Sequence, residues 1–116
     1  MVMVMVMVMV RFVSPDGIEL PPVPALMDTG ADRTIIPSAI AEGLQLRKGR
    51  EVELGGIGGT TIVMASYYVT IRIHDLPPIE CEVFATLGER HALLGRDVLN
   101  HFRVLLDGPR GVLEIE

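Results

Sequence analysis

The chain has 116 residues and a formal net charge of −5, from ten Lys and Arg against fifteen Asp and Glu. This length fits a single domain over residues 1–116 and excludes a two-domain enzyme with an interdomain cleft. The acidic balance, without a basic run, argues against nucleic acid or an anionic membrane as the main partner. No apolar stretch reaches the roughly 18 residues of a transmembrane helix. Cys81 has no second cysteine to pair with, so we expect a cytoplasmic protein without disulfides.

Residues 1–10 alternate Met and Val without a break. They lack the positively charged start and the small-residue cleavage site of a signal peptide. The alternatives are a tag-derived artefact and a native strand. Because Val favours extended backbone and Met fills irregular gaps, we expect a strand that is apolar on both faces. Such a strand belongs inside a sheet or a subunit interface, since an uncovered one invites edge pairing and aggregation.

The remaining elements are short and closely spaced. The turn residues Ser14-Pro15-Asp16-Gly17 predict a hairpin over residues 1–20, and prolines at positions 21, 22 and 24 predict an extended connector. Strands are expected over residues 23–27, 34–36, 51–54, 60–73, 79–86, 91–94, 104–106 and 112–115. Short helices are expected over residues 39–42 and 96–102. This pattern indicates an all-β domain, a closed or partly closed small barrel with one or two short helices.

Three segments hold the residues that point to chemistry. In residues 25–32 an apolar strand delivers the carboxylate of Asp28 into a tight turn over residues 28–32, which the glycine at position 30 allows. Residues 55–59 place four glycines around one isoleucine, which predicts a mobile hairpin tip that approaches a ligand through its backbone. Residues 93–97 combine a buried strand, a glycine break and the start of a short helix.

In this order and with these spacings, the three segments resemble the retropepsin-like (retroviral-type) aspartic proteases, in their cellular and bacterial branch. The resemblance covers roughly residues 23–106. It implies a small acid-protease barrel that hydrolyses peptide bonds without cofactor or metal. Two carboxylates about 3 Å apart then share one proton at weakly acidic pH and activate a water molecule. Because the chain has one Asp-Thr-Gly, the resemblance implies a C2 homodimer with Asp28 of each subunit on the axis.

The resemblance also implies a role for each residue of the three segments. Asp28 is the catalytic carboxylate, and Thr29, Gly30 and Ala31 support the catalytic loop. Gly30 and Asp32 contact the substrate backbone, and Arg96 pairs with Asp32 behind the site, a pair that is costly to break from one side. The substrate-covering flap consists of Gly55, Gly56, Ile57, Gly58 and Gly59, and the residues packed behind the catalytic loop are Leu93, Leu94 and Gly95.

Two features depart from the wider family. Pepsin-like enzymes usually have Ser where this chain has Ala31, and without that hydroxyl we expect a mildly acidic optimum of about pH 5–6. Viral members end soon after the final helix, whereas residues 103–116 here add a predicted hairpin. We expect its last strand, over residues 112–115, and the Met/Val strand to lie at or near the dimer interface.

Other interpretations stay open. Asp28 alone is also typical of a turn, and a catalytically silent dimerisation or peptide-binding module is the alternative function. The chain is also compatible with a domain cut from a longer precursor. His74, His91 and His101 lack metal-ligand spacing, Cys81 is expected to be an inert buried thiol, and Asp97 is expected to favour the helix N-terminus without a catalytic role. The partner is an extended peptide or protein, with apolar side chains expected beside the cut.

Overall fold

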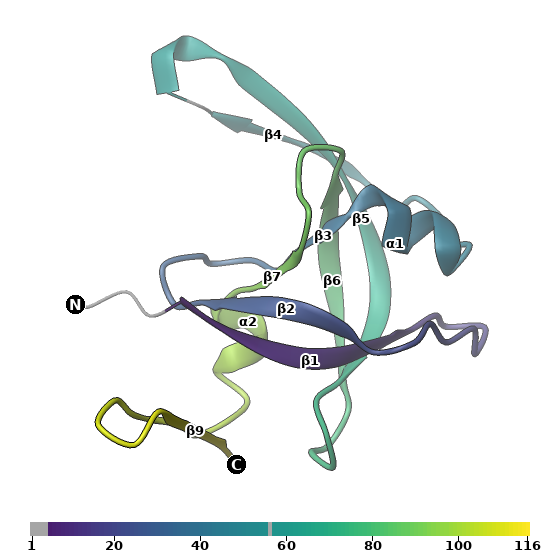
Figure 1. The fold of residues 1–116 in the computed structure, drawn as a ribbon. Helices are drawn as coiled ribbons and strands as arrows, with labels where there is room; N and C mark the ends of the chain where they lie inside the picture. The colour runs from purple at the N-terminus through teal and green to yellow at the C-terminus, as the bar shows by residue number, and fades with distance from the viewer. Residues whose placement is uncertain (1–4, 56) are drawn as a thin grey trace.

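The computed structural model describes residues 5–55 and 57–116, a mostly β fold with two short α-helices (Figure 1). The strands are β1 (Met5–Val13), β2 (Val23–Asp28), β3 (Ile35–Pro37), β4 (Glu51–Gly55), β5 (Thr61–Arg72), β6 (Ile79–Thr86), β7 (Ala92–Leu94), β8 (Val104–Asp107) and β9 (Val112–Ile115). The helices are α1 (Ser38–Gly43) and α2 (Arg96–Leu99), and a 3-10 turn spans Ile57–Gly59. Within these residues, no helix combines the length and apolar character needed to cross a bilayer.

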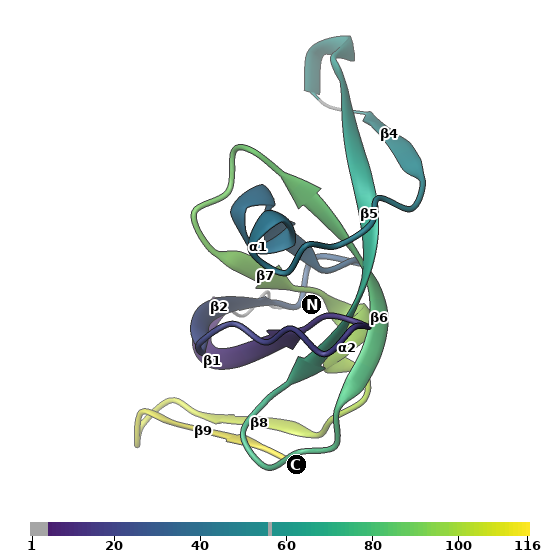
Figure 2. The ribbon, with the colours of Figure 1, turned by 90° about the vertical axis from the view of Figure 1, so that its right-hand side faces the viewer.

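Seven strands form one sheet in the order β1-β2-β7-β3-β6-β5-β4. β1 pairs antiparallel with β2 through its first half and with β5 through residues 11–13, so the sheet bends back onto its first strand (Figure 2). β7 runs parallel to β2, and β3 runs parallel to β6. β2 is therefore held between β1 and β7, and its C-terminal end is fixed on both sides.

The Met/Val strand is apolar on both faces, but only one face is buried within the chain. Val8, Val10 and the following Phe12 enter the core, whereas Met7 and Met9 are 44% and 45% exposed. The strand thus lies inside the sheet, as expected, and the single chain leaves its methionine face exposed. The turn at residues 14–17 is present, yet the chain returns only as a single bridge between Val13 and Glu19. The prolines at positions 21 and 22 cannot donate to a ladder, so the long partner of β1 is β2 instead.

The core fills the inside of the curved sheet. Alternate residues of β1, β2, β5 and β6 point into it, and α1 and α2 add apolar side chains from their inner faces. The hairpin of β8 and β9 forms a separate two-stranded sheet that extends away from the body (Figure 2). Leu113 and Ile115 pack against the core, while apolar side chains on the hairpin stay exposed: Val104, Leu105, Leu106 and Val112.

Candidate active site

The turn that follows β2 carries the predicted catalytic carboxylate. Asp28 is the last residue of β2 and is half-buried, and its Oδ1 accepts a hydrogen bond from the Gly30 N–H at 2.9 Å. The Ala31 N–H donates to the Asp28 carbonyl oxygen at 3.2 Å, which reverses the chain direction. The sheet therefore sets the position of this carboxylate, and the turn sets its orientation.

The start of α2 lies against the far end of this turn. The Arg96 N–H donates to the Ala31 carbonyl at 2.8 Å, and the Asp97 N–H donates to the Asp32 carbonyl at 3.3 Å. At Gly95 a Cβ atom would lie 2.7 Å from the backbone of Arg33. No real side chain tolerates that approach to a backbone, so Gly95 is what lets the helix reach the turn.

The Arg96 side chain connects the two ends of the turn. Its Nη1 donates to the Thr29 carbonyl at 2.8 Å, and its Nη2 forms an ion pair with Asp32 Oδ1. The Asp32 side chain is 81% exposed, so the expected cost of breaking a buried pair does not apply. Exposed ion pairs contribute little stability. What Arg96 adds is a bridge from residue 29 to residue 32 across the turn.

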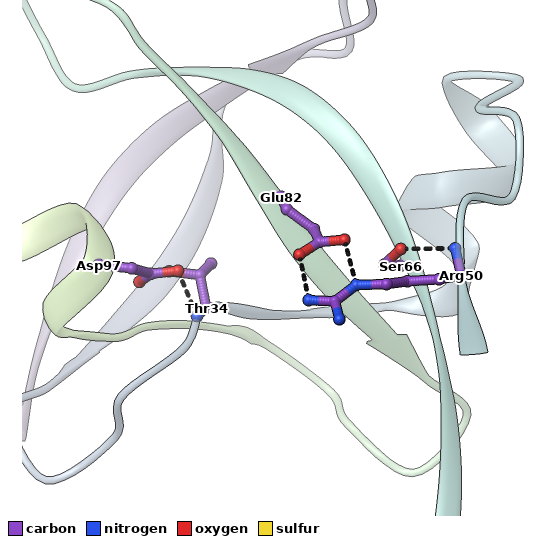
Figure 3. Close-up of polar contacts among 5 residues, drawn as sticks. All are labelled: Thr34, Arg50, Ser66, Glu82 and Asp97. Carbon is purple, nitrogen blue, oxygen red and sulfur yellow. Dashed lines mark hydrogen bonds and ion pairs between the residues drawn. The ribbon is translucent and has the colours of Figure 1, made fainter. Parts of the chain in front are cut away.

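Thr34 and Asp97 also hold the turn, and sequence reasoning did not single out Thr34 (Figure 3). Thr34 is fully buried, and its hydroxyl donates to Asp97 Oδ1 at 2.7 Å while its N–H donates to Asp97 Oδ2 at 3.0 Å. The Gly95 N–H donates to the Thr34 hydroxyl at 3.1 Å. The signal in the sequence was a hydroxyl at the start of an apolar strand, since buried hydroxyls require partners.

A cavity of about 360 Å³ adjoins the turn. Its lining is mainly apolar, with charged side chains from the turn and from Arg50, the residue before β4. The lining residues are Ala31, Asp32, Arg33, Ile35, Arg50, Val52, Met64 and Phe84. Two larger hollows, of about 600 and 650 Å³, border Met9 and His74 and include none of residues 28–32. We place the candidate site at the smaller cavity because the turn of residues 28–32, called the carboxylate turn below, forms part of its wall.

The hairpin of β4 and β5 projects beyond the body (Figure 1). Val52 of β4 and Met64 of β5 line the cavity. At its tip Gly58 and Gly59 have φ of +80° and +79°, which L side chains adopt only with strain. Gly55 and Ile57 lie on the same hairpin, whereas Gly56 falls outside the described residues. Behind the turn, Leu93 pairs with Leu26 of β2, and Leu94 is fully buried.

An ion pair at the cavity rim joins Arg50 to Glu82 (Figure 3). Arg50 Nε and Nη2 donate to the two carboxylate oxygens at 2.9 and 2.8 Å. These bonds from Arg50, helped by hydrogen bonding from Ser66, lower the pKa of Glu82 to about 2. Glu82 is therefore ionised at the mildly acidic pH of about 5–6 expected for the enzyme.

The other candidate ligands and nucleophiles take no part in this arrangement. Within the described residues, no group of three His, Cys, Asp or Glu side chains is placed to hold a metal ion. Cys81 is half-buried in β6, and burial, followed by the nearby charge of Asp97, raises the pKa of its thiol to about 12. The thiol is therefore protonated at neutral pH and is a poor nucleophile.

Comparison with known proteins places this geometry in a family. No curated protein matches the sequence. Among solved structures, the fold resembles the retroviral protease-like domain of Ddi1 from Leishmania major, at a TM-score of 0.57 and 15% identity over 96% of this chain and 85% of that one. It also resembles a retropepsin-like aspartic protease from Rickettsia conorii, at 0.57 and 14% over 99% and 93%. Residues 17–101 match the family described as "gag-polyprotein putative aspartyl protease". The chain therefore belongs to this family of retropepsin-like aspartic proteases.

Proposed function

We propose that the protein is an aspartic endopeptidase that acts as a C2 homodimer. The observation that carries the proposal is the turn of residues 28–32, which carries the Asp28 carboxylate. It follows β2, a strand paired on both sides, and its carbonyls at residues 31 and 32 accept hydrogen bonds from the first two N–H groups of α2. A surface turn without a function has no need of contacts from Gly95, Arg96 and Asp97. The apolar cavity beside the turn and the projecting hairpin supply a place for a peptide.

In this proposal the two Asp28 carboxylates share one proton. The ionised carboxylate takes a proton from a water molecule as its oxygen attacks the scissile carbonyl carbon, and the protonated one donates its proton to the carbonyl oxygen. Collapse of the resulting diol breaks the C–N bond as a proton passes to the leaving amine. The Gly30 N–H bonded to Asp28 Oδ1 stabilises negative charge on the carboxylate. The second chain supplies the second carboxylate, since one chain holds a single Asp-Thr-Gly.

We propose that the dimer uses the apolar surfaces left exposed in the single chain. β1 pairs with β2 as far as Asp28, and its Met7 and Met9 line the same hollow as Leu113 and Ile115 of the β8–β9 hairpin. The hairpin also exposes further aliphatic side chains. Exposed apolar patches on otherwise polar proteins mark interaction surfaces. Six strands pair in the closed order β1-β2-β7-β3-β6-β5 and back to β1. They would then form the body of a small barrel in each subunit, with the β4–β5 hairpin as its flap.

Cleavage of casein between pH 4 and 7 tests the proposal. Wild-type protein is compared with Asp28→Asn at several protein concentrations, and Asp16→Asn, an exposed turn aspartate, serves as the matched control. We expect wild type and Asp16→Asn to cut, Asp28→Asn to be inactive, and the rate to rise faster than linearly with enzyme, because only the dimer has two carboxylates. Equal cleavage by Asp28→Asn, or a folded dimer that binds peptides and never cuts them, would favour the silent module.

A further inference from the structure

The cavity beside the carboxylate turn is apolar inside and cationic at its rim. Ile35, Met64 and Phe84 supply aliphatic and aromatic surface, and the last two are almost fully buried. The charged residues at the rim are Asp32, Arg33 and Arg50. A peptide side chain that enters must therefore satisfy an apolar interior and a charged opening.

The charges at the rim do not cancel. Arg50 is paired with Glu82, and Asp32 is paired with Arg96, which makes two neutral pairs. Arg33 remains: within the described residues its side chain makes no ion pair or hydrogen bond, and it acts on Glu82 only as a nearby positive charge. Among the described residues that line the cavity and their ion-pair partners, three arginines face two carboxylates, and Arg33 is the charged lining residue without an ion-pair partner. The other two carboxylates near the turn, Asp28 and Asp97, are not part of the cavity lining.

Arg33 is also held in place by its backbone. Its carbonyl group lies against Gly95, and the next amide, of Thr34, is bound by the Asp97 carboxylate. The Arg50 backbone is likewise fixed, because the Ser66 N–H donates to the Arg50 carbonyl and the Arg50 N–H donates to the Ser66 hydroxyl. The Phe84 ring lies 6.0 Å from the Arg50 guanidinium. The exposed Arg33 side chain thus extends from a backbone that is already held in place, so binding a partner has to order the side chain alone.

We infer that this cavity binds a glutamate side chain of the substrate, with its methylene stem on the apolar wall and its carboxylate on Arg33. The inference rests on the proposed function and names the substrate class of the same site. A purely aliphatic side chain would satisfy the wall and leave Arg33 unpaired. A lysine would place a second cation beside it. Glutamate satisfies both the wall and the charge, and it is ionised at the mildly acidic pH expected for the enzyme.

Matched peptides test the inference. A peptide whose cleavage is lost in Asp28→Asn is made in sets with Glu, Gln or Lys at each position out to three residues from the cut. We expect kcat/KM to be about tenfold higher for Glu than for Gln at one position, as for a charge-assisted hydrogen bond. Arg33→Gln should abolish this ratio, and Arg33→Glu should favour Lys at the same position. Arg90→Gln, an exposed arginine outside the cavity, should keep the wild-type ratio.

Each outcome separates the inference from the proposed function. Equal rates for Glu and Gln at every position, or a preference that survives Arg33→Gln, overturn the inference and leave the Asp28-dependent protease standing. If no peptide is cleaved, the proposed function fails. Binding of the same fluorescent peptides to the Asp28→Asn variant then tests the cavity directly. A tenfold tighter Kd for Glu that depends on Arg33 supports the inference, and equal Kd values overturn it.

Discussion

At the scale of single residues, Ala31 is where the turn differs from pepsin-like enzymes. It is half-buried and contributes to the cavity wall. A serine hydroxyl there would donate to the carboxylate pair and favour its ionised form, so Ala31→Ser should move the rate maximum about one pH unit toward acid. The pH profile of kcat/KM measures this, with Ala39→Ser on the exposed side of α1 as control. An unchanged or more alkaline maximum, or a wild-type maximum below pH 3, would contradict the expectation.

Glu82 makes a second residue-level prediction, for stability. Its folded pKa of about 2 lies below the unfolded value of about 4.3, so its contribution is present above pH 4.3 and is lost as the pH falls toward 2. Arg50 is 60% exposed, and solvent screening limits the pair. We expect Glu82→Gln to lower the free energy of unfolding by about 1 kcal/mol at pH 7.

Urea unfolding at pH 7, 5 and 3 provides the measurement for Glu82. The difference in the free energy of unfolding between wild type and Glu82→Gln should narrow below pH 4.3, because the unfolded chain takes up a proton at Glu82 that the folded protein, with its lower pKa, does not. The exposed Glu53→Gln on β4 is the control and should change little at any pH. A difference between Glu82→Gln and wild type that grows toward pH 3 would show that the charge of Glu82 does not stabilise the fold.

At the scale of elements, the junction of β7 and α2 depends on Gly95. An added methyl group would meet the Arg33 backbone at 2.7 Å and push α2 off the turn. We expect Gly95→Ala to reduce the free energy of unfolding by about 1–3 kcal/mol, the range for overpacked sites. It should also reduce kcat/KM, since it displaces Arg33 and the carbonyls that α2 binds. Denaturant unfolding and peptide cleavage report the two effects.

Gly88→Ala is the matched control for that change. A Cβ at Gly88 has open space around it, and its backbone is outside the left-handed region. Stability and activity should stay at the wild-type level. If Gly95→Ala behaved like Gly88→Ala, the close approach of α2 to the turn would not be needed for the site.

Most elements were predictable because turn residues and apolar alternation mark their ends. β6 has the predicted bounds, and β9 does too, since Pro78 and Gly111 precede them. The predicted helix over residues 96–102 ends instead at Leu99, as its continuation packs into a turn before β8. The hydrogen bonds between Thr34 and Asp97 could not be predicted from the sequence, because these residues are 63 positions apart and only the three-dimensional fold brings them together.

At the scale of the whole molecule, assembly is expected to depend on the β8–β9 hairpin. Leu105 is 51% exposed on this separate sheet, and a charge there would have to be buried in the proposed interface. Leu105→Asp should therefore yield a folded monomer with no casein cleavage. Deleting residues 111–116 should have the same effect on assembly, whereas deleting residues 1–10 would also remove Val8 and Val10 from the core and so tests folding as well as assembly. Sedimentation at several concentrations gives the mass, and Tyr68→Asp, an exposed site on β5, is the control. A dimer that survives both Leu105→Asp and the deletion of residues 111–116 would place the interface elsewhere.

The hydrogen bonds and the ion pair that join Arg96 and Asp97 to residues 29–34 also set the order in which the site is completed during synthesis. The bonds from Arg96 and Asp97 reach residues 63 to 67 positions earlier in the chain. A growing chain that has left the ribosome only as far as β6 contains Asp28 but lacks Arg96 and Asp97, and therefore all of these bonds. Contacts of such long sequence separation form late in folding. A nascent or truncated chain thus carries Asp28 in a turn that α2 does not yet hold, and in the proposed function it cannot cleave a peptide until α2 has docked.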